Sequence, residues 1–224
     1  MNNGYRNNKK KIKADTAHKR STAPKPLRPS FAASGERTSL RAGTLLGPLP
    51  AVMVTCGDMD RPNVVTVAWT GIVCTKPPML YISLRPQRFS HELISASGEF
   101  VVNLVPSSLS LACDWCGMYS GRDHDKFAEC PQSITPVPSV KVGCPSLAQS
   151  PLSLECKVVS VTPLGSHDMF LASVENITVD SALLDSNGKL DLSRASLRAF
   201  AHGEYFAAWD KVADFGVSVR KKQR

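Results

Sequence analysis

Short runs of apolar and β-branched residues, rather than long amphipathic stretches, make up most of the chain's hydrophobic pattern. These runs are rich in Val, Ile, Thr and aromatic residues, and turn sequences such as DMDRPN and TKPP separate them. Both features are typical of β-strands. The last two runs alternate apolar and polar positions with a period of two, as half-buried antiparallel strands do. The predicted strands are residues 51–57, 63–73, 79–84, 99–105, 152–162 and 168–180.

Helical signals are few and short. The sequence SHELISAS predicts a helix with Ser90 as its N-cap and Gly98 as its left-handed C-cap. A second helical stretch is expected from residue 107 to about residue 118, directly after Pro106. Many short strands and few helices favour a closed or nearly closed antiparallel barrel over alternating βα units. The predicted fold class is therefore mainly β.

Charge is distributed unevenly along the chain. Residues 1–41 hold 11 Lys or Arg and two acids, a net charge of +9, so the formal charge of +8 for the whole chain leaves about −1 for the rest. We expect a disordered basic tail over residues 1–41 and one folded domain over residues 42–224. The domain has no basic stripe interleaved with aromatics, so nucleic-acid binding is expected only through the tail, if at all. Neither a secretory signal nor a membrane span is expected.

Seven cysteines are spread along the chain, and an odd number cannot pair completely. In the absence of a secretory signal, reduced thiols and a cytoplasmic location are expected. Cys113 and Cys116 form a C-x-x-C sequence, which suits either a redox pair or half of a zinc site. A second C-x-x-C or a suitably spaced His pair is missing, so no metal site is predicted. The helical spacing around the two residues favours buried cysteines on a helix.

Cations and hydroxyl groups gather near the predicted strand ends. The sequence SLRPQRFS brings Ser83, Arg85, Arg88 and Ser90 close together, and donors of this kind suit a phosphate. Taken singly, each is better explained as a solvated side chain or a helix cap, and the charged run GMYSGRDHDKF as a solvated face. A site therefore depends on their convergence at one rim. Neither a G-x-G-x-x-G sequence after a strand nor a Walker sequence occurs, which excludes those two nucleotide-binding motifs.

Four stretches of the sequence, taken in order, resemble a known family. They are PLPAVMVTCGDMDRPNVVTVAWTGIVCTKPPMLYISLRPQRFSHELISASGEFVVNLV, SGRDHDKF, LGSHDMFLASV and HGEY. Together they resemble the flavin reductase-like proteins of the FMN-binding split barrel, including the flavoredoxin-type members, over about residues 46–208. Any one stretch alone would be a weak signal, but the ordered set is specific. The resemblance implies an FMN-binding split β-barrel for the domain.

The same resemblance implies which residues contact the flavin. A T-x-A-W strand would line the isoalloxazine, the SLRPQRFS segment would hold ribityl and phosphate oxygens, and the SGRDHDKF segment would lie against the flavin and its phosphate chain. His167 matches a position near the place where nicotinamide stacks, and a positioning donor is its expected role. The implied cofactor-binding residues are Thr66, Val67, Ala68, Trp69, Ser83, Arg85, Arg88, Ser90, Asn103, Ser120, Gly121 and Lys126.

Three functions remain open from the sequence. The first is an NAD(P)H-dependent flavin reductase, in which hydride passes from NADH or NADPH to N5 of FMN. The second is a flavoredoxin-like FMN electron carrier that a redox partner protein reduces. The third is binding of nucleic acid or of an acidic partner through the basic tail, with the barrel as a scaffold. The resemblance also implies a homodimer.

Overall fold

The computed structural model describes residues 31–207, and the chain divides into two compact units, Met1–Gly43 and Thr44–Arg224. Within the first unit, residues 31–43 are exposed and form neither helix nor strand. Most of the predicted basic tail falls on residues 1–30, which lie outside the described residues. The same holds for residues 208–224 at the end of the predicted domain. The folded elements described below all belong to the second unit.

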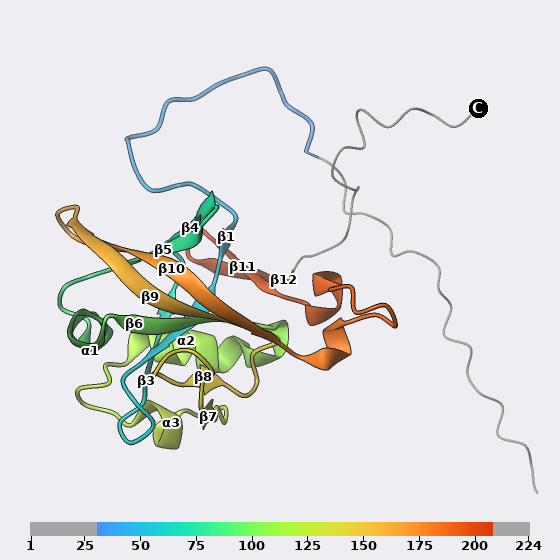
Figure 1. The fold of residues 1–224 in the computed structure, drawn as a ribbon. Helices are drawn as coiled ribbons and strands as arrows, with labels where there is room; N and C mark the ends of the chain where they lie inside the picture. The colour runs from blue at the N-terminus through green and yellow to red at the C-terminus, as the bar shows by residue number, and fades with distance from the viewer. Residues whose placement is uncertain (1–30, 208–224) are drawn as a thin grey trace, which may run out of the picture. The chain divides into compact units, whose positions relative to one another are not determined.

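A seven-stranded antiparallel sheet forms the body of this unit, which confirms the predicted mainly β fold (Figure 1). The strands are short and rich in β-branched residues, which pack well on a pleated, half-buried surface. In spatial order they are β3 (Asn63–Val67), β2 (Val52–Cys56), β6 (Glu99–Leu104), β9 (Leu152–Pro163), β10 (Asp168–Val179), β5 (Pro78–Leu84) and β4 (Thr70–Thr75).

The prediction of one strand over residues 63–73 was wrong. The structure divides this run into β3 and β4, which lie at opposite edges of the sheet and are joined only by Ala68 and Trp69. The backbone N–H of Ser83 in β5 donates to the carbonyl of Trp69 at 2.9 Å. The two edges of the sheet therefore meet at this junction, and the sheet curls into a barrel. The barrel is incomplete along the outer edge of β3, where no further strand of the described residues pairs.

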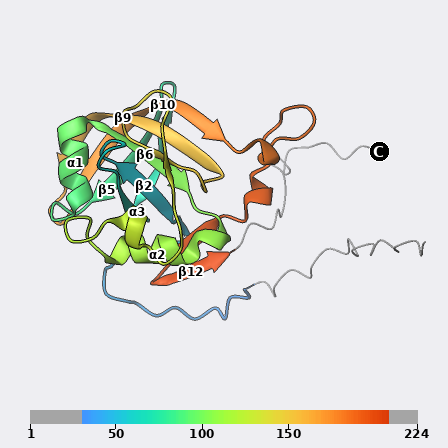
Figure 2. The same cartoon turned by 90° about the horizontal axis from the view of Figure 1, so that it is seen from below.

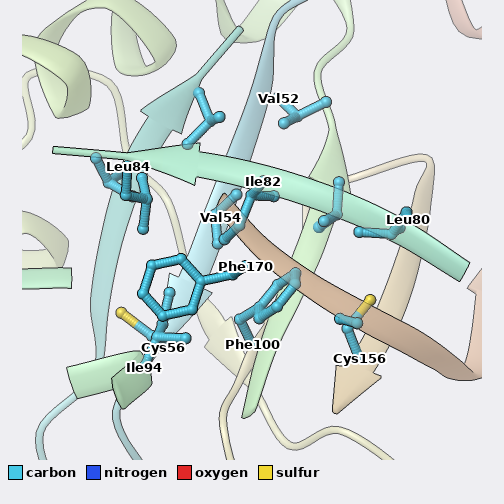
Figure 3. Packing of buried hydrophobic residues seen from close by; sticks show 14 residues of the cluster. Val52, Val54, Cys56, Leu80, Ile82, Leu84, Ile94, Phe100, Cys156 and Phe170 are labelled. Atoms are coloured by element: carbon cyan, nitrogen blue, oxygen red, sulfur yellow. The ribbon is translucent and has the colours of Figure 1, made fainter. Parts of the chain in front are cut away.

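The barrel core comes from residues of six strands, together with Ile94 of helix α1 (Phe89–Ser97). Figure 3 shows Phe170 and Phe100 side by side at the centre, with aliphatic residues of β2 and β5 around them. Phe170, Phe100 and Ile94 are all fully buried. Burial of side chains of this size stabilises the fold by about 1.5–3 kcal/mol each.

Helix α1 begins two residues earlier than predicted. Its N-cap is Arg88, without a side-chain cap, and Ser90 is its second residue rather than its cap. The Ser90 hydroxyl accepts a hydrogen bond from the Asn63 side chain at 2.8 Å, so a neighbouring strand uses the group that would have capped the helix. The helix ends as predicted, at Gly98 with a φ of 69°. A left-handed C-cap of this kind favours glycine because a Cβ would be strained there.

A second helical stretch matches its prediction closely. A 3₁₀ turn, η1 (Ser107–Leu109), leads directly into α2 (Ser110–Met118). Figure 2 shows α2 against the sheet near β2, where it packs on Met53 and Val64. Cys113 and Cys116 lie fully buried on its inner face, as the helical interpretation expected, and all seven cysteines are free.

Several smaller elements gave no clear signal in the sequence. They include a second sheet of three strands, a strand pair inside the Pro-rich connector and three short helices. These elements are β1 (Leu49–Pro50), β11 (Arg198–Ala201) and β12 (Glu204–Ala207), β7 (Pro136–Val137) and β8 (Ser146–Leu147), α3 (Lys126–Glu129), η2 (Ser181–Leu183) and η3 (Leu192–Ala195). Among residues 31–207, no helix has the length and apolar character needed to cross a membrane.

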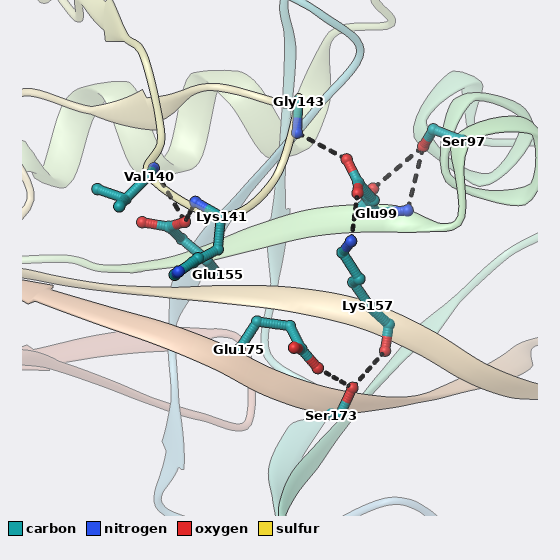
Figure 4. A network of polar contacts seen from close by, with 9 residues as sticks. All are labelled: Ser97, Glu99, Val140, Lys141, Gly143, Glu155, Lys157, Ser173 and Glu175. Atoms are coloured by element: carbon teal, nitrogen blue, oxygen red, sulfur yellow. Dashed lines mark hydrogen bonds and ion pairs between the residues drawn. The ribbon is translucent and has the colours of Figure 1, made fainter.

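A buried carboxylate holds the Pro-rich connector against the sheet (Figure 4). Glu155 of β9 is fully buried and accepts hydrogen bonds from the backbone N–H groups of Val140 at 3.0 Å and Lys141 at 2.5 Å, and from the Asn176 amide at 2.8 Å. Burial raises the pKa of this carboxyl, but these hydrogen bonds lower it more, so it lies below its ordinary value.

Candidate functional site

Two adjoining cavities form one groove at the open side of the barrel. They measure about 630 and 160 Å³, and Val65, Arg85 and Arg88 line both of them. We call this combined space the main groove. Its walls come from β3 and the β3–β4 junction, the end of β5, the start of α1, the loop before α3 and the turn between β9 and β10. Segments far apart in the sequence therefore meet along the unpaired edge of β3.

The main groove brings together twelve of the thirteen residues proposed from the sequence. These are Thr66, Val67, Ala68, Trp69, Ser83, Arg85, Arg88, Ser90, Ser120, Gly121, Lys126 and His167. The convergence that the sequence required is therefore present. What each residue does toward a ligand stays a proposal.

The structure does not bring Asn103 to the groove lining. Its side chain is fully buried, and its amide donates to the Met53 carbonyl and to the Thr55 hydroxyl, both at 3.0 Å. Its oxygen accepts from the backbone N–H of Leu147 at 2.9 Å and from the Ser153 hydroxyl at 2.8 Å. These bonds tie together β2, β6, β8 and β9. Because protein partners already use both ends of its amide, Asn103 is placed to stabilise the sheet.

The larger cavity is the cationic end of the main groove, because Lys126 lines it together with Arg85 and Arg88, which also reach the smaller cavity. Arg85 is exposed and Arg88 is half-buried, and among residues 31–207 neither guanidinium has a hydrogen bond or an ion pair with another side chain. The first turn of α1 lies beside them, with Phe89 and the buried Ser90 in the lining. A helix N-terminus and two unpaired arginines together favour an anion.

Lys126 also lines this end, but its amine already has partners. It is almost fully buried, and Nζ donates to the carbonyls of Val64 and Cys116, both at 2.8 Å. Burial is the largest cause that lowers the pKa of this amine, and the charge of Arg88 also lowers it; surrounding thiols raise it, and the net pKa is about 8. The side chain therefore joins β3 to the C-terminal end of α2, and an ammonium there has one N–H left for the groove.

The other end of the main groove is lined by the β3–β4 junction. Because β3 is an edge strand, the backbone groups on its open edge have no strand partner and can pair with a planar ligand. The Thr66 hydroxyl donates to the carbonyl of Cys113, so this side chain fixes β3 to α2.

The rings of Trp69 and His167 contact each other in a tilted arrangement in the lining of this end. Their ring centroids lie 4.4 Å apart with an interplanar angle of 40°, and Trp69 is 37% exposed. His167 Nδ1 lies 2.9 Å from the Ser166 hydroxyl. Partial burial and then the charge of Arg85 hold the pKa of His167 below its ordinary value. At neutral pH its ring is therefore mostly uncharged, so one ring nitrogen donates a hydrogen bond and the other accepts one.

The charged run from the sequence forms the loop beside the cationic end. The Ser120 carbonyl accepts from the N–H groups of Asp123 and His124, and Asp125 caps α3 by accepting from two backbone N–H groups. Gly121 packs so tightly that a Cβ there would lie 2.1 Å from Oδ1 of Asn63. This close approach requires glycine and lets the loop lie against the groove.

Sequence reasoning missed six residues that also line the main groove: Val65, Leu84, Gln87, Phe89, Tyr119 and Ser166. Each of them is a direct chain neighbour of a residue that was predicted. A wider window around each motif would have found them.

Comparison with known proteins identifies a family. The family model described as "Flavin reductase like domain" matches residues 47–194. The flavoredoxin structure of Desulfovibrio vulgaris (Miyazaki F) is 31% identical with a TM-score of 0.75, over 82% of this chain and all of that one. A structure with a split barrel domain from Shewanella frigidimarina shares the fold at 21% identity and a TM-score of 0.67, over 75% of this chain and 85% of that one.

Relatives with curated names agree with this assignment. An uncharacterized protein of Archaeoglobus fulgidus is 32% identical over 72% of this chain and 88% of its own length. An NADH-dependent FMN reductase of Streptomyces nodosus subsp. asukaensis is 28% identical over 63% of this chain and 74% of its own length. The resemblance and the split-barrel fold predicted from the sequence are confirmed, and the chain belongs to the flavin reductase-like domain family.

Proposed function

We propose that the chain binds FMN in the main groove and acts as an NAD(P)H-dependent flavin reductase. The observation that carries the proposal is the pairing of two kinds of surface in one groove. Arg85 and Arg88, both without a partner among the described side chains, face one end, and the open edge of β3 lines the other. A phosphorylated planar ring has a matching division between a doubly charged end and a flat heteroaromatic end.

The residues present fit FMN in shape and charge. The Gly121 position, where a Cβ would collide with Asn63, keeps the loop low beside the cationic end. Arg85, Arg88 and the N-terminus of α1 would hold the phosphate, and the backbone of residues 66–68 would line the ring. When bound, the flavin supplies a hydride acceptor at N5.

The chain's own residues then align and shield rather than exchange protons. Backbone N–H groups on the open edge of β3 would donate to a ring that gains negative charge, which lowers the barrier electrostatically. His167 and Trp69 stand at the mouth of the same end, where they would position a nicotinamide ring and exclude water. A neutral His167 suits a positioning donor, because hydride transfer needs no acid or base on the protein.

The test is anaerobic reduction of the FMN-loaded protein by NADH and by NADPH, followed at the flavin absorbance band. Bleaching at a catalytically useful rate with either nucleotide is the expected result. An FMN protein that dithionite bleaches while both nucleotides leave it oxidised would reject the reductase proposal. That outcome would favour the flavoredoxin-like carrier, for which the similarity to the flavoredoxin structure at 31% identity is the supporting observation.

We further propose a homodimer in a reducing compartment such as the cytoplasm. Ile72 and Val73 on the edge strand β4 are 70% and 51% exposed, and contiguous exposed apolar residues are typical of interaction surfaces. The seven free cysteines support reducing surroundings. Sedimentation of the wild type against Ile72→Lys tests the dimer, since a lysine at the interface would shift the equilibrium toward monomer.

The third function considered from the sequence, binding through the basic tail, rests largely on residues 1–30, outside the described residues.

A further inference from the structure

A hydrogen bond between the His91 ring and the Asp168 carboxylate connects the two ends of the site outside the main groove itself. His91 Nε2 lies 2.8 Å from Asp168 Oδ2, and both side chains are largely shielded, at 17% and 16% exposed. Since the carboxylate can only accept, the ring nitrogen donates. The His91 ring also lies edge-on to Phe170, with the centroids 5.0 Å apart. Contact with this fully buried core residue fixes the ring against the barrel.

Each partner of this pair is attached to a different part of the groove wall. His91 is the third residue of α1, directly after Phe89 and Ser90, which line the cationic end. Asp168 is the first residue of β10 and directly follows His167. The turn before Asp168 is closed by a hydrogen bond from the Leu164 N–H to the His167 carbonyl at 2.8 Å.

We propose that Asp168 and His91 are positioning residues that hold His167 in contact with Trp69, and so set how the nicotinamide donor is received. This inference rests on the proposed reductase function. The turn that carries His167 is exposed from Val161 to Ser166, so packing alone gives it little restraint. The Asp168 carboxylate ties this turn to His91 of helix α1. The same helix also lines the cationic end.

A turn that is restrained before the donor arrives has less conformational freedom to lose on binding. When Asp168 is fixed, the backbone of the adjacent His167 is held in place as well. The 4.4 Å contact between the rings of His167 and Trp69 then depends on the rotamer of His167. Pairing with Leu84 of β5 and Pro163 of β9 already holds the backbone of Asp168 in the sheet, and the pair with His91 adds a tether to α1. Without this tether, more of the ordering of the turn and of the His167 ring would take place when the donor binds. That ordering cost weakens binding of the donor and leaves the phosphate end of the site unchanged.

The experiment uses the full-length FMN-loaded protein and four variants. Asp168→Ala and His91→Ala remove the pair, Asp168→Asn keeps an acceptor for the His91 N–H, and the double alanine variant tests coupling. Lys157→Ala is the matched control, because its 3.4 Å ion pair with Glu99 joins β9 to β6 away from the groove (Figure 4). The readouts are KM and kcat for NADH and NADPH, the Kd of FMN, and amide hydrogen exchange at residues 164–168 without nucleotide.

The expected result is faster exchange at Leu164 and a KM about tenfold higher for both alanine variants, with the Kd of FMN changed by less than about twofold. Asp168→Asn should recover part of the loss, the double variant should be no worse than either single one, and Lys157→Ala should match the wild type. Unchanged exchange at residues 164–168 would overturn the proposal, as would a loss of FMN affinity equal to the rise in KM. If the wild type oxidises neither nucleotide, the proposed function fails, and the exchange at Leu164 alone decides whether the pair positions the turn.

Discussion

At the scale of single residues, the positively charged side chains at the cationic end have two different roles. Among residues 31–207 the Arg88 guanidinium has no hydrogen-bond partner, whereas the Lys126 amine donates to two backbone carbonyls. A cation without a partner can give its hydrogen bonds to a ligand, while a cation with partners mainly holds the protein together. The sequence treated both as flavin contacts, because it shows residue type and spacing but not which bonds are already made.

Arg88→Ala should weaken FMN binding by about 1.5–3 kcal/mol, or roughly ten- to hundredfold in Kd. The reason is the loss of a charge-assisted bond to the phosphate. Fluorescence titration of FMN measures it, with Arg194→Ala as the control because Arg194 is an exposed cation of η3 outside the groove lining. Equal affinity in wild type and Arg88→Ala would place the phosphate elsewhere.

Lys126→Met should reveal a buried amine through the pH dependence of stability. The folded pKa near 8 lies below the ordinary value of 10.5, so between these values the unfolded chain binds more protons and the wild type gains stability as pH rises. Relative to Lys126→Met, the free energy of unfolding of the wild type should rise by about 2–3 kcal/mol from pH 7.5 to 10.5. Urea denaturation measures it, and the nearby thiols are common to both proteins. A difference that does not vary with pH would mean that the amine keeps its ordinary pKa.

At the scale of elements, the break at Ala68 and Trp69 determines the site. The run 63–73 has strong strand propensity throughout, yet tertiary pairing with β2 on one side and β5 on the other divides it. Local preference cannot choose between one long strand and two short ones, because both satisfy it equally. The division leaves β3 with an open edge, and that edge lines the main groove.

Glu155→Gln should destabilise the protein by about 1–3 kcal/mol at neutral pH, because the Gln amide can turn a donor toward the N–H groups of Val140 and Lys141. The carboxyl has a lowered pKa, so its contribution is present above its unfolded value and is lost as pH falls through the folded value. The difference in the free energy of unfolding between the wild type and Glu155→Gln should therefore narrow below about pH 4.5. Chemical denaturation from pH 7 to 3.5 measures it.

Glu175→Gln is the matched control for this change. Glu175 is exposed and bonds only to the neighbouring Ser173 hydroxyl, so its replacement should have little effect at any pH. A pH-independent loss in Glu155→Gln, or an equal loss in Glu175→Gln, would contradict the role given to the buried carboxylate.

At the scale of the whole molecule, FMN binding should raise the free energy of unfolding of the protein. FMN at about 100 times its Kd should add about 2.7 kcal/mol and raise Tm by roughly 5–10 °C. Riboflavin at the same concentration should raise it less, because it lacks the phosphate that Arg85 and Arg88 are proposed to hold. Thermal melting with each ligand measures this, and equal shifts would show that the cationic end contributes nothing.

The sequence by itself determined the class of fold, most strand and helix positions, and the residue types of the site. Period-two alternation, turn residues and a left-handed glycine are local signals, so they can be read without knowing the fold. The ordered motifs likewise indicated the family. Twelve of the residues they implied do line one groove.

Only the tertiary structure decided which side chains are free to act. Asn103 and Lys126 have the residue types of ligand contacts, yet the fold gives Asn103 to the sheet and most of the hydrogen bonds of Lys126 to β3 and α2. Ser90 became a helix residue bonded to Asn63 instead of a cap. The pairing of His91 with Asp168 spans 77 positions in the chain. Hydrogen-bond capacity is used up by whichever neighbours folding brings close, and those neighbours are set by long-range packing rather than by local sequence.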